Sequence, residues 1–178
     1  NTIEPVTQIA EETSSDTHPI DLNIDPKRHE EIRSSYKDEQ DKENERRIRM
    51  VVEYIHFYMP RIADEETVNH VCNEVSNWMN KNNYKPKPIK RRLTQDISNI
   101  PLRHFIWNIA EGCMYKRYYN GDNRARFVKE LFPREFAETD IATIKNFRID
   151  PLKPPIPIDE LEDGKLDFHY PNGYLQKE

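Results

Sequence analysis

The residues best suited to chemistry lie in the middle of the chain, where basic and aromatic side chains gather with few acids between them. Residues 75–126 hold eleven lysines and arginines but only three aspartates and glutamates, a net charge of +8. Cations of this kind displace the counterions condensed on a phosphate backbone, and aromatic rings stack on exposed bases. The middle of the chain therefore indicates a nucleic-acid-binding surface.

Two clusters within this segment supply the candidate binding residues. The first is a basic run beside Trp78 and Tyr84, and the second surrounds a group of tyrosines further along the chain. The residues that we predict to bind nucleic acid are Lys85, Lys87, Lys90, Arg91, Arg92, Lys116, Arg117, Tyr118, Arg124 and Arg126. The alternatives are a protein partner, a plain solvated basic face, and a basic face that docks the acidic arm of the same chain.

A helix-turn-helix over residues 124–148 is a second hypothesis for DNA contact. It would place helices at 124–132 and 139–147 around a turn at 133–138, with the second helix reaching into a groove. This turn is longer than the usual three to four residues and contains no glycine. Most apolar residues of the segment are also needed for packing, so we favour a pair of core helices.

Other chemistry finds little support in the spacing of reactive residues. The four glycines are too far apart to form a phosphate-cradling loop, which disfavours P-loop and dinucleotide-binding folds. Glu53 and His56 have the spacing of a helical metal-ligand pair, but the second copy that such sites need is missing. Cys72 and Cys113 have no CxxC partner. We therefore expect no catalytic residue, no metal site and no cofactor, and a protein that is not an enzyme.

The two cysteines also bear on the compartment. Each lies on the apolar face of an expected helix, which is typical of buried free thiols in a reducing environment. No apolar run approaches the ~20 residues of a membrane span. We expect a cytoplasmic protein that makes no membrane contact.

The elements that must position these residues are helices. Asp25 and Pro26 give a helix start, and nothing interrupts that helix before Pro60. A regular apolar stripe predicts a second helix, opened by Asp64, over residues 64–80. Further helices are expected near 89–97, 101–113, 122–132 and 139–147. Asp122 is the expected cap of the helix near 122–132. The prediction is an all-α fold, a single compact bundle of five to six helices.

The two ends of the chain differ in texture from this bundle. Residues 1–25 form a polar N-terminal arm within a segment, 1–46, that carries a net charge of −7. Residues 26–148 form the helical domain, and residues 149–178 an extended, Pro-rich C-terminal arm lying along it. Apolar and polar residues alternate near the end of this arm, which leaves open a small β-hairpin near 156–170.

The leading interpretation is a non-enzymatic accessory or regulatory protein that binds DNA or RNA through its basic, aromatic-containing middle segment. The alternative is an adaptor or structural subunit of a protein assembly. In that case residues 1–25 and 149–178 would become ordered on a partner, as polar segments with scattered apolar residues do.

Overall fold

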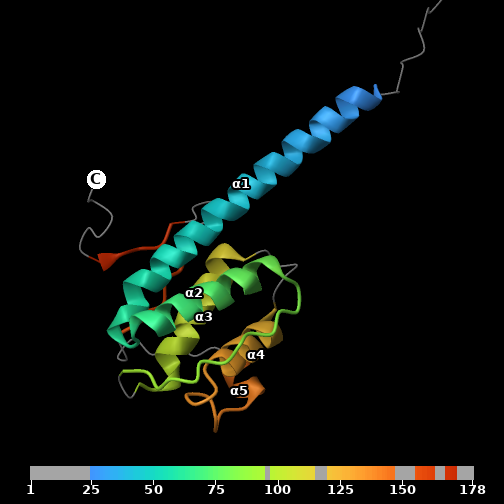
Figure 1. The fold of residues 1–178 in the computed structure, drawn as a ribbon. Coiled ribbons are helices and arrows are strands. Elements are labelled where there is room, and N and C mark those ends of the chain that lie inside the picture. The colour runs from blue at the N-terminus through green and yellow to red at the C-terminus, as the bar shows by residue number, and fades with distance from the viewer. Residues whose placement is uncertain (1–24, 95–96, 115–119, 147–154, 163–166, 172–178) are drawn as a thin grey trace, which may run out of the picture. The chain divides into compact units, whose positions relative to one another are not determined.

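A computed structural model of the chain describes residues 25–94, 97–114, 120–146, 155–162 and 167–171. In these residues it contains five α-helices and one 3-10 turn and no strand, so the predicted all-α fold is confirmed (Figure 1). The open possibility of a hairpin near 156–170 is not realised in residues 155–162 and 167–171. The elements are α1 (Pro26–Tyr58), η1 (Met59–Arg61), α2 (Glu65–Asn80), α3 (Asn99–Cys113), α4 (Gly121–Leu131) and α5 (Ile141–Lys145).

The chain divides into two units between Asp38 and Glu39, and α1 contributes residues to both. The helix begins as predicted, since the Asp25 side chain accepts a hydrogen bond from the Lys27 N–H at 3.1 Å. All described residues of the first unit, 25–38, are exposed. They are mostly charged and contain too few apolar groups to form a core.

The core of the second unit is built by apolar faces of α1 to α5. On α2 the predicted stripe is buried from Val68 to Met79, and α3 is buried over most of its surface. The Trp78 ring of α2 stacks on Phe127 of α4 with ring centroids 4.2 Å apart. Aromatic contact and apolar burial together fix α4 against α2. None of the helices in the described part of the chain is long and apolar enough to cross a lipid bilayer.

The C-terminal segment is part of this core. Ile156 is fully buried and Phe168 is 5% exposed. Phe168 stacks on Tyr54 of α1, with ring centroids 4.2 Å apart. The buried Asn108 amide donates to Tyr54 Oη at 2.8 Å and to the Pro157 carbonyl at 2.9 Å. Residues 155–162 and 167–171 therefore pack against the helices and complete their core.

The prediction of a helix near 89–97 is wrong for the described residues. The chain forms no helix between Tyr84 and Thr94. Ile89 and Leu93 are both buried, as their spacing suggested, but they are buried from a segment without regular secondary structure. The Ile89 N–H donates to the Leu131 carbonyl at 2.9 Å, and the Thr94 N–H to the Ile62 carbonyl at 2.7 Å. Neighbouring elements thus satisfy backbone groups that a helix would have paired internally.

The segment proposed as a helix-turn-helix forms two helices of unequal length. α4 has eleven residues, whereas α5 has only five and is capped by Asp140, whose carboxylate accepts from the Thr143 N–H at 2.7 Å. Ile144 of α5 is buried against the other helices. A helix of five residues spans little more than one turn, too short to lie along a groove. This arrangement agrees with a core helix pair.

Candidate nucleic-acid interface

The centre of the candidate interface is the connection between α2 and α3, residues 81–94, which we call the basic loop. It runs from the end of α2 past α4 (yellow-green in Figure 1). The His70 ring donates from Nε2 to the Lys87 carbonyl at 2.9 Å, since a carbonyl can only accept. Together with the backbone bonds of Ile89 and Thr94, this contact holds the loop along its length.

Glu74 of α2 is the main anchor of the loop. It is 5% exposed, and its Oε2 accepts from the Tyr84 hydroxyl and from the Lys87 N–H, each at 2.8 Å. Burial, together with the hydrogen bond to Glu74, raises the pKa of Tyr84 to about 12. The tyrosine therefore stays protonated and keeps donating to Glu74 at neutral pH.

This anchoring turns the cations of the loop outward. Lys85, Lys87, Lys90 and Arg92 are exposed, while Pro86, Ile89 and Leu93 are buried between them. A loop held by its backbone and its apolar side chains presents these charges without having to order itself on binding. These four predicted residues are therefore all exposed on one loop, and we call them the exposed row.

Arg91 is also exposed, but its guanidinium is already engaged. It lies 2.8 Å from Asp64 Oδ2 and 2.5 Å from Glu66 Oε2. The Asp64 carboxylate caps α2 by accepting from the Thr67 N–H at 2.9 Å, and this bond together with Arg91 lowers its pKa to about 2. Arg91 thus ties the loop to the start of α2. The two carboxylates compensate its positive charge, so it attracts a phosphate less strongly.

Among the described residues of the second cluster, only Arg126 is exposed. It is exposed on α4 and lines, with Lys85, a small pocket of about 170 Å³. Lys85 and Arg126 come from the two separate clusters predicted from sequence, and the fold brings them to one site. The other residues that line the small pocket are Trp78, Asn83, Tyr84, Asn123, Phe127 and Glu130.

Arg124 is a correction to the predicted set, because it is 7% exposed and is used inside the fold. Its Nη1 donates to Glu111 Oε1 at 3.3 Å, and its Nη2 to the Lys145 carbonyl at 3.2 Å. Residues two apart on a helix point to different faces, so Arg126 is exposed where Arg124 is not. Lys116, Arg117 and Tyr118 lie outside the described residues.

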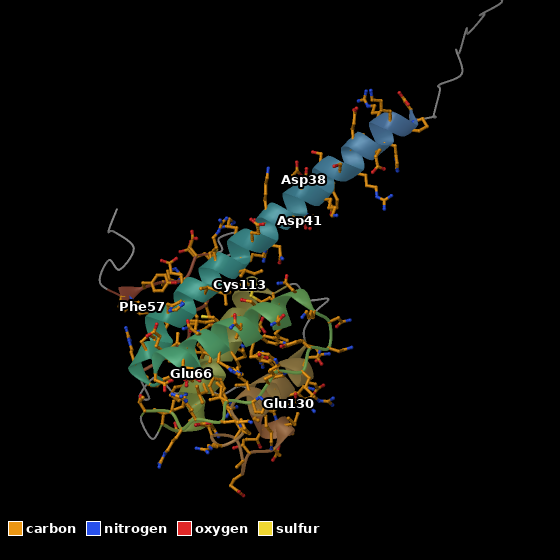
Figure 2. All side chains as sticks on the ribbon, in the orientation of Figure 1. Asp38, Asp41, Phe57, Glu66, Cys113 and Glu130 are labelled. Atoms are coloured by element: carbon orange, nitrogen blue, oxygen red, sulfur yellow. The ribbon has the colours of Figure 1, made fainter. Side chains whose placement is uncertain are left out.

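A larger pocket of about 580 Å³ lies further along the basic loop, beside the start of α2. Its lining residues are Glu66, Thr67, His70, Lys87, Pro88, Ile89, Lys90 and Arg91. Figure 2 labels Glu66, at the start of α2, and Glu130, near the end of α4, which belong to the larger and the smaller pocket respectively. Each pocket therefore holds one carboxylate among its cations, and Glu66 of the larger pocket is already paired with Arg91.

Several residues of the site were missed by sequence reasoning. Glu74 was not among the predicted binding residues, yet it is buried and binds the loop. The N-cap of α4 is Asn120, whose Oδ1 accepts from the Asn123 N–H at 2.9 Å, and not Asp122. Asn83 adopts a left-handed backbone with φ of 53°. The only signal for this conformation in the sequence was the residue type itself, because asparagine tolerates it better than most residues.

The residues considered for enzymatic chemistry are placed as follows. Both cysteines are free and buried, which confirms the sequence prediction. Burial raises the pKa of Cys72 to about 11 and that of Cys113 to about 12. Glu53 and His56 are both exposed on α1. Within the described ranges, no three histidine, cysteine, aspartate or glutamate side chains gather as metal ligands would.

The buried carboxylate of Asp159 pairs with the exposed imidazole of His169. His169 donates to Asp159 from its N–H at 2.8 Å and from its Nδ1 at 2.6 Å. The Asp159 N–H in turn donates to Asn108 Oδ1 at 2.9 Å. These bonds connect two parts of the C-terminal segment to α3, which is a structural role.

Comparison with known proteins gives no family: no family model, no curated protein and no solved structure matches this chain. The geometry of the basic loop and its two pockets is therefore the ground on which a function is proposed.

Proposed function

We propose that this chain is a non-enzymatic nucleic-acid-binding protein, with an accessory or regulatory role, that binds DNA or RNA along its basic loop. The observation that carries the proposal is the exposed row Lys85, Lys87, Lys90 and Arg92 on a backbone fixed by Glu74 and His70. Arg126 extends this row onto α4. Cations held in place in this way bind a phosphate backbone by releasing its counterions.

The acidic charge elsewhere in the chain supports a local binding face. The chain as a whole has a net charge of −5, so general attraction to nucleic acid is weak away from this loop. The two free thiols fit a reducing compartment, which supports a cytoplasmic location.

The test is the binding of labelled single-stranded and duplex oligonucleotides over a series of salt concentrations, followed by fluorescence anisotropy. We expect affinity to fall steeply with salt. The triple variant Lys85→Ala, Lys87→Ala, Lys90→Ala should weaken binding, and its salt slope should be smaller by roughly two to three.

A matched control separates the loop from total charge. The variant Lys37→Ala, Lys42→Ala, Arg49→Ala removes the same number of positive charges from exposed positions of α1. We expect it to bind nucleic acid like the unchanged chain. The proposal is contradicted by no binding at about 50 mM salt, where phosphate contacts are strong, or by equal losses in the two triple variants.

A second candidate function, an adaptor or structural subunit, is favoured by one observation on α1. Ile32 and Tyr36 are 55% and 63% exposed and lie four residues apart, so they share one face of the helix. Paired apolar groups on an otherwise charged helix are what a protein partner would cover. Light scattering after size exclusion, on the chain alone and mixed with its natural neighbours, tests this candidate, and a monomer in every mixture speaks against it.

A further inference from the structure

The small pocket between the basic loop and α4 is unlike the rest of the candidate interface, because it combines rings, amides and charges in a confined space. Its volume of about 170 Å³ is below the roughly 300–1,000 Å³ of pockets that enclose a whole small ligand. It suits a single flat group that projects from a larger molecule bound outside.

The aromatic wall of the pocket is ordered before any ligand arrives. Trp78 and Phe127 are stacked in parallel and at most 2% exposed, so they offer little more than their edges. Tyr84 is half-buried and has the largest accessible part of the three rings. Its hydroxyl is held by Glu74 at 2.8 Å, and Lys81 Nζ lies over the ring, 5.4 Å from its centroid. A ring fixed in this way loses little entropy when another ring stacks on it.

The polar wall of the pocket matches the edge of a nucleobase. Asn83 and Asn123 each have an amide with both donors and an acceptor, and Glu130 has a carboxylate that can accept from an exocyclic amino group. Lys85 and Arg126 supply positive charge at the same pocket. Groups for a base and groups for its phosphate are therefore present together.

We infer that the small pocket binds one unstacked base of a single-stranded nucleic acid, with the neighbouring phosphates on Lys85 and Arg126. The inference rests on the proposed function and adds the class of nucleic acid to it. Bases of a duplex are paired and stacked inside the helix, whereas bases of a single strand can turn out and stack on protein rings. The chain should therefore prefer single strands, of DNA or RNA, to the duplex of the same sequence.

The first experiment compares Tyr84→Leu with Tyr84→Phe in oligonucleotide binding. Base stacking on one ring is strong enough that its loss should weaken single-strand binding about tenfold or more. Tyr84→Phe keeps the ring and should retain single-strand binding more nearly than Tyr84→Leu. Both variants lose the hydroxyl bond to Glu74, so any change in duplex affinity should be the same in the two, and the salt slope should be unchanged because no phosphate contact is removed. Circular dichroism of each variant checks that the helices are intact.

Asn123→Ala is a second variant that does not depend on the anchoring of Tyr84. Its backbone N–H, not its side chain, makes the capping bond of α4, so the helix keeps its cap. We expect it to lower single-strand affinity and to alter the preference among homopolymers of different bases. The matched control is Asn69→Ala, at an exposed position of α2 outside both pockets, which should change neither.

Trp78 provides a direct spectroscopic readout, because it lines the pocket. In a Trp107→Phe background it is the single tryptophan of the chain. Single-stranded oligonucleotide should quench its fluorescence, and duplex should bind without quenching. A mononucleotide that quenches as strongly as the oligonucleotide at equal base concentration would overturn the inference in favour of a free-nucleotide site.

The failure of this inference and that of the proposed function look different. If no nucleic acid binds at low salt, the proposed function fails and the inference fails with it. If nucleic acid binds and the triple lysine variant weakens it, the proposed function stands. In that case equal affinity for single strands and duplex, with no loss in Tyr84→Leu, overturns the inference alone.

Discussion

Glu74 shows how much of this interface depends on one side chain. It was not among the residues predicted to bind, but the fold buries it and gives it two donors from the basic loop. A carboxylate taken out of water must be satisfied by hydrogen bonds, and here those bonds come from residues ten and thirteen positions away. Pattern reasoning on α2 alone contains no information on these partners.

We expect Glu74→Ala to lower the free energy of unfolding by about 2–4 kcal/mol, because it leaves the part-buried Tyr84 hydroxyl and Lys87 N–H without their acceptor. Urea unfolding followed by circular dichroism measures this loss. Glu74→Gln keeps one acceptor oxygen and should lose less. Asn69→Ala, an exposed position of the same helix, is the control, and equal stability of the Ala variants at 69 and 74 would contradict the role of Glu74.

The two thiols give a prediction that depends on pH. Burial raises the pKa of Cys72 from 9.0 to about 11 and that of Cys113 to about 12. Because the thiolate is the reactive form, Cys72 at neutral pH should react about a hundredfold more slowly than an unperturbed thiol, and Cys113 more slowly still. The reaction rate should rise about tenfold for each unit of pH, up to the pKa.

Labelling with a thiol reagent at several pH values measures these rates. Cys72→Ser and Cys113→Ser assign each phase to one residue, and labelling in denaturant gives the rate of an unburied thiol. Rapid labelling of the native chain at neutral pH would show that the thiols are not buried as described.

At the level of elements, helix ends were predicted well and the connections between helices were not. Asp25 and Asp64 each cap the helix that the sequence assigns to them, and Pro60 follows the end of α1. These signals act over three or four residues, so they can be read locally. The basic loop could not be derived in the same way, because the bonds from Ile89 to Leu131 and from Thr94 to Ile62 join distant parts of the chain.

α5 is a case in which a short helix depends on another element. A helix of five residues is not stable by itself. Its C-terminal carbonyls accept hydrogen bonds from Arg103 of α3, which is 7% exposed and donates to the Thr143 carbonyl at 2.8 Å and to the Asn146 carbonyl. Burial and the charge of Arg124 lower the pKa of Arg103, which reflects the cost of placing it there. The guanidinium stabilises the negative end of the helix.

We therefore expect Arg103→Ala to unfold α5 locally and to reduce global stability by about 2–3 kcal/mol, since the carbonyls lose a buried charged donor. Hydrogen exchange should show faster exchange of the amides of Ile144 and Asn146, which donate within α5. Arg134→Ala, at an exposed position, is the control. Unchanged protection of α5 in Arg103→Ala would refute this dependence.

For the molecule as a whole, the sequence predicted which residues are available for binding and the fold decided which of them meet. Lys85 and Arg126 were predicted in separate clusters, and they share the small pocket because Trp78 and Phe127 stack α2 on α4. Arg124 belonged to the same predicted set, yet the helix turns its side chain inward. Charge and spacing identify candidates, whereas the direction of each side chain depends on long-range packing.

The C-terminal segment gives the corresponding test for stability. The composition of residues 149–178 predicted an arm beside the helical domain, and in residues 155–162 and 167–171 the fold uses that arm to complete the core. Ile156 is fully buried, and Phe168 covers Tyr54, whose hydroxyl also accepts from Asn108. The helices alone would expose these groups to water, so residues 26–148 should not reach full stability by themselves.

We expect Phe168→Ala to lower the free energy of unfolding by about 3–5 kcal/mol, the usual loss for a buried phenylalanine in a core. His169→Ala, at the exposed residue next to it, removes the imidazole bond to Asp159 and should cost less. Urea unfolding of both variants measures the difference, and a double variant with Tyr54→Phe tests whether the hydroxyl and the ring act together. If Phe168→Ala were as stable as the unchanged chain, the segment would be a dispensable arm, because a residue that completes the core cannot be removed without cost.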